Sequence, residues 1–260
     1  MRVVQLGSGR PEVAVVGAIH GDEPSGAVAI ERLIEDPPAV QRPVKLIIAN
    51  EEALEQGARF LESDLNRAFP GDPTSDRLED RLAARLLEEL EGCVTLALHS
   101  TQSFAEPFAI VGRVDDTARR IVPSLPVSYL VETGEFAEGR LLPHIRVIEV
   151  ECGLQGSPEA ADNAEAVVRA FLAATGVTAG PPDETRSVEV FRLRTQVAKP
   201  PADEYAVAVD SFERVAPGTA YARANGRTLT TDTEFYPVLM SAYGYEDIFG
   251  YKADRVGALE

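Results

Sequence analysis

The chain has 260 residues and carries 42 Asp and Glu against 25 Lys and Arg, for a net charge of −17 at pH 7. Hydrophobic residues make up 45% of it, so the sequence is that of a globular protein and not of a disordered acidic polymer. A strongly negative field repels phosphate, which argues against nucleic acids and anionic membranes as partners.

Only three of the basic residues are lysines: Lys45, Lys199 and Lys252. Scarce lysine and abundant Asp and Glu favour a halophilic protein, whose self-repulsion is screened within about 3 Å at 1 M salt. The alternative is an ordinary acidic enzyme from a GC-rich genome. No stretch approaches the roughly 20 apolar residues of a membrane span, and no signal-peptide pattern opens the chain. We therefore expect a cytoplasmic protein with no membrane partner.

Strand-like and helix-like segments alternate over the first two thirds of the chain. The predicted strands are Glu12–Ile19, Val44–Ala49, Val94–Leu98, Phe108–Val111, Ser128–Val131 and Arg146–Val150. The predicted helices are Pro24–Leu33, Ser75–Leu90 (with Ser75 as N-cap) and Pro158–Ala174. This alternation predicts an α/β fold with a mixed, largely parallel sheet and helices on both faces.

The character of the sequence changes after Thr175. The segment Thr178–Glu184 is rich in Gly and Pro, as linkers often are. Beyond it, β-type runs follow at Ser187–Leu193, Tyr205–Val209 and Thr228–Thr231. We expect an α/β domain over residues 1–177 and a small β-rich domain over residues 183–260.

Two of the three histidines follow buried strands. His20 and Glu23 lie in the turn GAIHGDEP, and His99 lies just past the strand Val94–Leu98. Active sites of open α/β sheets lie at the carboxyl ends of strands. Two histidines and a glutamate hold zinc while leaving a position open for water. The alternative interpretation of each residue alone is a polar pair or a hydrogen-bonded core histidine.

Two further segments carry charged side chains. Arg59–Gly71 has little helical periodicity and ends in Pro-Gly, so it is a loop, either with ordinary solvated arginines or with arginines that capture a carboxylate. In the run VIEVECG, Glu149 and Glu151 share one strand face, because alternate side chains point the same way. A buried glutamate there would have a raised pKa suited to a general base. A solvated edge strand is the alternative.

In this order, the four segments resemble the succinylglutamate desuccinylase/aspartoacylase family of zinc-carboxypeptidase-like hydrolases, over roughly residues 12–175. The resemblance implies one zinc ion per chain, held by His20, Glu23 and His99. It also implies that Glu151, in the element ECG, is the catalytic base.

The same resemblance assigns roles in the Arg59–Gly71 loop. Asn66 and Arg67 of the sequence DLNR would bind substrate, and Arg59 would polarise the scissile carbonyl. The family also has a substrate arginine shortly before its catalytic glutamate, for which Arg140 and Arg146 both qualify.

Two features make the resemblance incomplete. The family usually has Asp two residues before its third metal ligand, where this chain has Ala97, so another residue must orient His99 or the metal site is looser. The family's C-terminal part contributes a tyrosine to the pocket. Tyr245 is our choice for that role, with Tyr236 and Tyr243 as neighbours in the same segment.

With these residues in place, the resemblance implies zinc-dependent hydrolysis of the amide bond of an N-acyl amino acid or a related small anionic molecule. One alternative is a metallocarboxypeptidase that acts on peptides, and another is a metal-binding relative without catalysis. An acidic surface is compatible with a homo-oligomer. We also expect a local positive potential at the carboxyl edge of the sheet.

Overall fold

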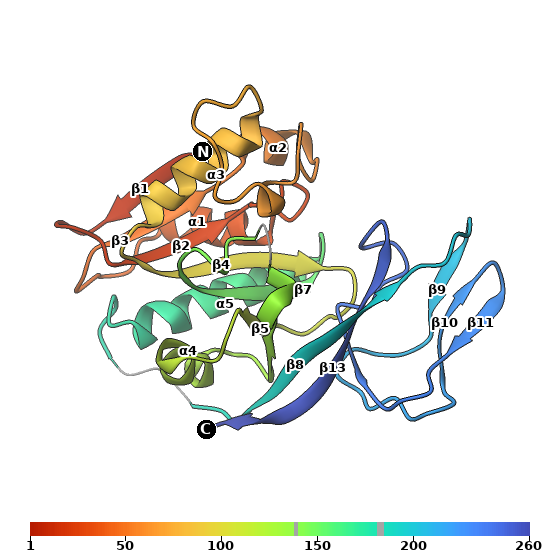
Figure 1. The fold of residues 1–260 in the computed structure, drawn as a ribbon. Coiled ribbons are helices and arrows are strands. Elements are labelled where there is room, and N and C mark those ends of the chain that lie inside the picture. The colour runs from red at the N-terminus through yellow and green to blue at the C-terminus, as the bar shows by residue number, and fades with distance from the viewer. Residues whose placement is uncertain (138–139, 181–184) are drawn as a thin grey trace.

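A computed structural model describes residues 1–137, 140–180 and 185–260 (Figure 1). Its main feature is a ten-stranded sheet with the strand order β1-β3-β2-β4-β7-β5-β6-β8-β13-β12. The strands are β1 (Arg2–Leu6), β2 (Val13–Gly17), β3 (Val44–Ile48), β4 (Val94–Thr101), β5 (Phe108–Val111), β6 (Tyr129–Glu132), β7 (Arg146–Leu154), β8 (Val188–Ala198), β12 (Tyr236–Val238) and β13 (Ile248–Leu259).

Pairing in this sheet is mixed. The central strands β3, β2, β4 and β7 are mutually parallel, as are β5, β6 and β8. Antiparallel pairing joins β1 to β3, β5 to β7, β8 to β13 and β12 to β13. The predicted fold class, a mixed and largely parallel sheet with helices, is confirmed.

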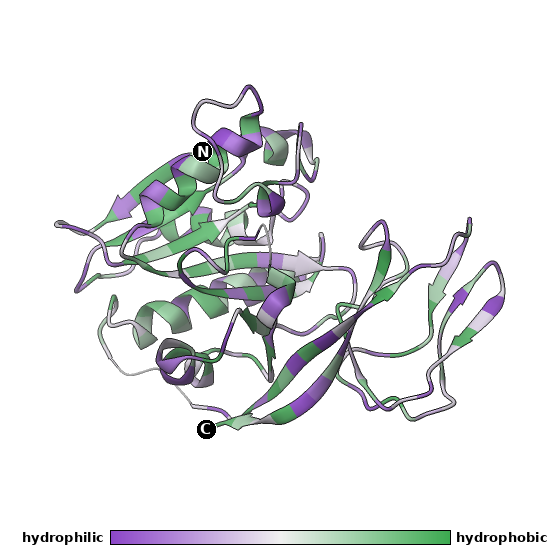
Figure 2. Ribbon diagram, viewed as in Figure 1, coloured by the Kyte–Doolittle hydropathy of each residue, from purple (hydrophilic) through white to green (hydrophobic). Residues whose placement is uncertain are grey.

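Helices cover both faces of the sheet. They are α1 (Ser25–Glu35), α2 (Glu51–Gln56), α3 (Leu78–Leu90), α4 (Asp116–Ile121) and α5 (Pro158–Ala174). Apolar side chains of α1, α4 and α5 pack in one core cluster, and those of α3 pack in a second cluster. Figure 2 shows the apolar strands between these helices. Burial of both sheet faces explains why β2 is a continuous apolar run and why β4 is apolar from Leu96 to Leu98.

The side chains of Asn50, Asp115 and Ser157 cap the starts of α2, α4 and α5. At α5, Ser157 Oγ accepts a hydrogen bond from Ala160 N, and the helix begins at Pro158, where the sequence predicts its start. The predicted start of α3 at Ser75 is wrong, because the helix begins at Leu78. Ser75 Oγ instead bonds Asp80 Oδ2 and Arg77 N and shapes the turn before the helix.

The C-terminal strands belong partly to the central sheet. β8 and β13 pair along their length and extend towards a three-stranded sheet of β9 (Tyr205–Val207), β10 (Ala220–Ala224) and β11 (Arg227–Thr230) (Figure 1). That small sheet packs on a separate apolar cluster. The division at residues 177–183 stays a prediction, and residues 181–184 of the predicted linker lie outside the described residues.

Two strands are longer than predicted, which affects the site. β4 continues to Thr101 and β7 to Leu154, so His99 and Glu151 lie within strands. The parallel strands β2, β4 and β7 are neighbours, so their carboxyl ends meet at one edge. None of the described helices is both long and apolar enough to cross a bilayer.

Candidate active site

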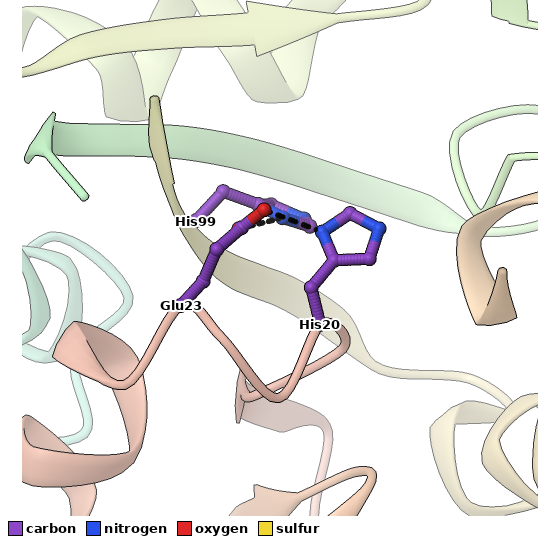
Figure 3. Close-up of side chains that lie close together, drawn as sticks. All are labelled: His20, Glu23 and His99. Atoms are coloured by element: carbon purple, nitrogen blue, oxygen red, sulfur yellow. Dashed lines mark hydrogen bonds and ion pairs between the residues drawn. The ribbon is translucent and has the colours of Figure 1, made fainter. Parts of the chain in front are cut away.

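His20, Glu23 and His99 converge at the carboxyl edge of the sheet (Figure 3). His20 Nδ1 lies 2.7 Å from Glu23 Oε1, and His99 Nδ1 lies 3.1 Å from Glu23 Oε2. One possible ligand atom from each residue lies within 4.8 Å of the others, and all three residues are buried. This donor set could hold a metal ion.

The turn after β2 brings His20 and Glu23 together. Ala18 has φ +52°, a left-handed conformation that turns the chain sharply out of the strand. A Cβ on Gly21 would lie 2.2 Å from the carbonyl carbon of Ala53 at the start of α2, so only glycine fits there. Gly21 N also donates to Arg59 O. These contacts fix the turn against the loop that carries Arg59.

The three groups influence one another's protonation. Burial by itself would lower the pKa of His99, but the hydrogen bond and charge of Glu23, with the charges of Glu149 and Glu151, raise it to about 9. Burial also opposes the charged form of His20, yet Glu23 and Asp64 raise its pKa. The two imidazoles in turn hold the pKa of Glu23 well below its usual range despite burial. A metal ion would therefore have to displace protons from the histidines.

Asp64 contacts the imidazole nitrogen of His20 that faces away from Glu23. His20 Nε2 lies 3.1 Å from Asp64 Oδ1 and 2.9 Å from an Arg59 nitrogen. When Nε2 carries the proton and donates it to Asp64, the lone pair of Nδ1 faces Glu23. Burial would raise the pKa of Asp64, but its bond to His20 and the charges of His20, Arg59 and Arg67 lower it.

Arg59 bridges the same carboxylates. It donates to Glu23 Oε1 at 3.0 Å and, through Nε and an amino nitrogen, to Asp64 Oδ2 at 3.2 Å. Burial opposes its charge, but Glu23, Asp64 and Asp22 raise the pKa of the guanidinium. Arg59 therefore stays charged beside the three convergent side chains.

A buried glutamate organises the loop before Asp64. Glu79, on the first turn of α3, is 0% exposed. Its two oxygens accept hydrogen bonds from the backbone N–H groups of residues 61, 62 and 63, at 2.7–3.2 Å, and from Asn50 Nδ2. One carboxylate thus fixes three successive residues between Arg59 and the 3₁₀ turn η1 (Leu65–Arg67).

Glu151 lies beside His99 on the neighbouring strand. The two are register partners in the parallel pair β4 and β7, and Glu149 shares the same face two residues earlier. Burial, with the charges of Glu23 and Glu149, raises the pKa of Glu151 to about 7 although the histidines oppose the shift. Within the described residues, Glu151 Oε2 has no hydrogen-bond partner.

These side chains line one cavity of about 280 Å³. Its wall contains all nine residues that the sequence singles out for metal binding, catalysis or substrate binding, namely His20, Glu23, Arg59, Asn66, Arg67, His99, Arg140, Glu151 and Tyr245. Two of them are mutually repelling cations: burial and the charge of Arg140 lower the pKa of Arg67. The wall also holds the carboxylates of Asp22, Glu23, Glu149 and Glu151, so the expected local positive potential stays a prediction.

The alternative candidates that the sequence leaves open lie at different positions relative to the cavity. Arg140 lines the cavity and is 8% exposed, whereas Arg146 lies at the opposite end of β7 and is exposed. Arg140 donates to Tyr251 Oη at 3.1 Å. Tyr243 and Tyr245 both line the cavity, whereas Tyr236 does not.

Asp64 and Glu79 were not predicted to be residues of the site. Asp64 stands in the same DLNR motif as Asn66, so its place in that loop was the available signal. Glu79 stands on an amphipathic helix among other acidic residues, and no local pattern marks it as buried. Asn66 is placed in the cavity wall, where its Oδ1 also accepts a hydrogen bond from Leu141 N.

Part of the chain is similar in sequence to a known family of hydrolases. Residues 9–109 match the family model for the succinylglutamate desuccinylase/aspartoacylase catalytic domain. A probable aspartoacylase from Nostoc sp. is 40% identical over 60 residues, and an N-acyl-aromatic-L-amino acid amidohydrolase from Xenopus laevis is 36% identical over 61 residues. Each alignment covers 22% of this chain and 20% of the relative.

Solved structures match almost the whole chain. A succinylglutamate desuccinylase/aspartoacylase from Rhodobacter sphaeroides has a TM-score of 0.79 at 19% identity, covering 98% of this chain and 89% of the other. The ectoine utilization protein EutE (DoeB) from Ruegeria pomeroyi has 0.77 at 21%, covering 99% and 88%. Murine aminoacylase 3 has 0.73 at 20%, covering 97% and 98%. These structures show a shared fold, and with the family model they confirm the predicted resemblance.

Proposed function

We propose that this chain is a zinc-dependent hydrolase that cleaves the amide bond of an N-acyl amino acid or a related small anionic molecule. The observation that carries the proposal is the convergence of His20, Glu23 and His99 in one cavity with the half-buried Glu151. The family match over residues 9–109 supports the same reaction class.

The three convergent residues suit zinc. Two imidazoles and one carboxylate are a usual ligand set for catalytic zinc, with a position left open for water or substrate. His99 and Glu23 are 4% and 5% exposed, so their polar atoms need a partner other than bulk water. When bound, zinc would supply a Lewis acid that polarises the scissile carbonyl and acidifies the attacking water.

Glu151 is the proposed general base. Its pKa of about 7 lets it take a proton near neutral pH and later pass that proton to the leaving amine. Its unpartnered Oε2 is free to accept the proton. Arg59, held beside Glu23, is the proposed stabiliser of the negative charge that develops on the carbonyl oxygen.

The remaining cavity residues favour an anionic substrate. Arg67 and Arg140 place two guanidinium groups in the wall, and a substrate carboxylate would relieve their mutual repulsion. Asn66 has its Oδ1 engaged by Leu141 N, which leaves its Nδ2 as the donor for substrate. Tyr245, from the segment between β12 and β13, is the proposed tyrosine of the pocket.

The wall formed by this segment distinguishes the proposed deacylase from a peptidase. Leu239, Ser241, Gly244 and Tyr245 line the cavity together with the metal-site residues. A cavity of about 280 Å³ that includes this wall suits a small acyl amino acid better than an extended peptide. We therefore prefer the deacylase to the metallocarboxypeptidase.

The proposal is tested with two variants and matched controls. Glu151→Gln should keep stoichiometric zinc and lose about 10²–10⁴-fold in kcat on a panel of N-acyl amino acids, because the base is removed. His20→Ala should lose the metal. Glu159→Gln and His144→Ala are the controls, since both residues are exposed and outside the cavity. Undiminished turnover in the first variant, or full zinc content in the second, would contradict the assignments.

A further inference from the structure

Several buried polar atoms near the proposed metal site have no hydrogen-bond partner among the described residues. Besides Oε2 of the proposed base Glu151, they include Nε2 of His99 and Oε1 of Glu149. His99 and Glu149 are only 4% and 3% exposed. A buried donor or acceptor that stays unpaired costs about 1–3 kcal/mol, so such atoms are rarely left without a function.

The sheet register places these two residues on one face of adjacent strands. In the parallel pair of β4 and β7, Ala97 is the partner of Glu149, and His99 is the partner of Glu151. Alternate side chains share a face, so His99 and Glu149 stand on the same surface, one diagonal step apart on strands about 4.8 Å from each other. Both residues line the cavity.

His99 needs a partner on its outer nitrogen. Its Nδ1 is directed to Glu23, so Nδ1 is the atom placed for a metal, and Nε2 then carries the proton. A metal-bound histidine is usually held by a carboxylate or carbonyl at its other nitrogen. His20 has such a partner in Asp64. On β4 itself, the side chain two residues before His99 is the methyl group of Ala97, which cannot accept a hydrogen bond.

We propose that Glu149 is the positioning residue of His99: its carboxylate accepts the Nε2–H hydrogen bond through one bridging water and fixes the tautomer that leaves Nδ1 free for the metal. Ala97 on β4 has no carboxylate, so the hydrogen-bond acceptor for His99 has to come from the neighbouring strand β7. This inference rests on the proposed function in one respect, that His99 is a metal ligand. A competing role for Glu149 is to balance the charge of Arg140, because the negative charge of Glu149 raises the pKa of that guanidinium.

The test measures zinc affinity rather than turnover. Glu149→Ala, Glu149→Gln and the double variant Ala97→Asp/Glu149→Ala are titrated with zinc against a chromogenic chelator at neutral pH. We expect the alanine variant to bind zinc about 10–100-fold more weakly than the wild type. Glutamine should keep most of the affinity, because its amide oxygen accepts the same hydrogen bond. The double variant should recover part of the loss, because its carboxylate approaches His99 from β4.

The outcomes separate the two proposals. Unchanged zinc affinity in Glu149→Ala would overturn the inference, and a raised KM in the same variant would assign Glu149 to Arg140 instead. The inference would also be overturned if Glu149→Gln and the double variant both bound zinc as weakly as Glu149→Ala does. The metal-free unfolding transition of each variant checks that it folds. A wild-type protein that binds no zinc would refute the proposed function itself.

Discussion

The Nε2 atom of His20 lies 3.1 Å from Oδ1 of Asp64, on the side of the imidazole opposite Glu23. Asp64 comes from a loop far along the chain and also accepts hydrogen bonds from Arg59 and from Asn66 N. One carboxylate therefore orients a proposed metal ligand, a proposed oxyanion stabiliser and the backbone that carries the proposed substrate residues. The proposed metal site and the proposed substrate site share a single support.

Replacing this carboxylate should weaken metal binding. Both oxygens of Asp64 accept hydrogen bonds, Oδ1 from His20 and Oδ2 from Arg59, and Asp64→Asn replaces one of them with an NH2 donor. One of these contacts is therefore lost, and we expect zinc affinity to fall by about 10–100-fold. Chelator competition measures the effect. Asp162→Asn is the control, because it removes a carboxylate from a surface ion pair with Arg32 whose Asp side chain is 72% exposed. Equal affinities in the two variants would show that Asp64 does not support His20.

Replacing the buried Glu79 should lower activity without removing the metal. In Glu79→Gln the amide nitrogen cannot accept the backbone N–H groups that the carboxylate accepts, so the loop carrying Arg59 and Arg67 should shift. A displacement of about 1 Å near a reacting group can cost 10²-fold, and we expect a fall of that order in kcat/KM. Zinc should still bind stoichiometrically when it is supplied in excess, because His20, Glu23 and His99 lie on other segments.

The matched control for Glu79 lies on the same helix. Glu88→Gln makes the same chemical change at an exposed position of α3. If both variants keep wild-type kcat/KM, the loop does not depend on the buried carboxylate. If Glu79→Gln lowers only the melting temperature, the glutamate contributes to stability and not to the placement of the loop.

Parts of this site could be predicted from local sequence. The apolar run before His20 and the period-two pattern through Glu149 and Glu151 indicate buried strands whose ends carry polar groups, and the structure has both. Predictions of that kind work because strand and helix patterns repeat every two or every 3.6 residues.

Long-range contacts could not be predicted in this way. The choice of Arg140 over Arg146 depends on where β7 begins relative to the cavity, which neither arginine's neighbours reveal. Strand β13 was not predicted at all, because its own sequence contains glycines and charged residues. Its pairing with β8 determines its strand conformation. The start of α3 differs from the prediction because Asp80 captures the Ser75 hydroxyl.

The metal-free protein should lose stability as the pH rises. Folding raises the pKa of Glu151 from 4.5 to about 7 and that of His99 from 6.5 to about 9. Between about pH 5 and 9 the unfolded chain therefore binds fewer protons than the folded chain, so the free energy of unfolding falls with increasing pH. Melting temperatures of chelator-treated protein across this range measure the slope.

A variant separates the two contributions to this slope. Glu151→Gln removes the group that titrates in the lower half of the range, so its melting temperature should be flatter up to about pH 7 and still fall above it. Zinc should stabilise the wild type more at high pH, since binding must displace the His99 proton. A melting temperature of the metal-free protein that rises steadily from pH 5 to 9 would be incompatible with these pKa shifts.

The two arginines that the sequence could not separate give the last prediction. Arg140→Ala removes a buried guanidinium from the cavity wall and should raise KM for an N-acyl amino acid by about 10–100-fold, the equivalent of 1.5–3 kcal/mol for a charged hydrogen bond. Arg146→Ala, at the exposed opposite end of β7, should leave KM unchanged. Steady-state kinetics on an acyl amino acid and on its carboxamide measure both.

The carboxamide substrate makes this comparison specific for charge. If Arg140 binds the substrate carboxylate, the wild type should discriminate strongly between acid and amide, and Arg140→Ala should lose most of that discrimination. Tyr251→Phe, which removes only the hydroxyl that accepts from Arg140, should produce a smaller loss in the same direction. A KM that rises equally for acid and amide in Arg140→Ala would mean that the arginine shapes the cavity without contacting the carboxylate.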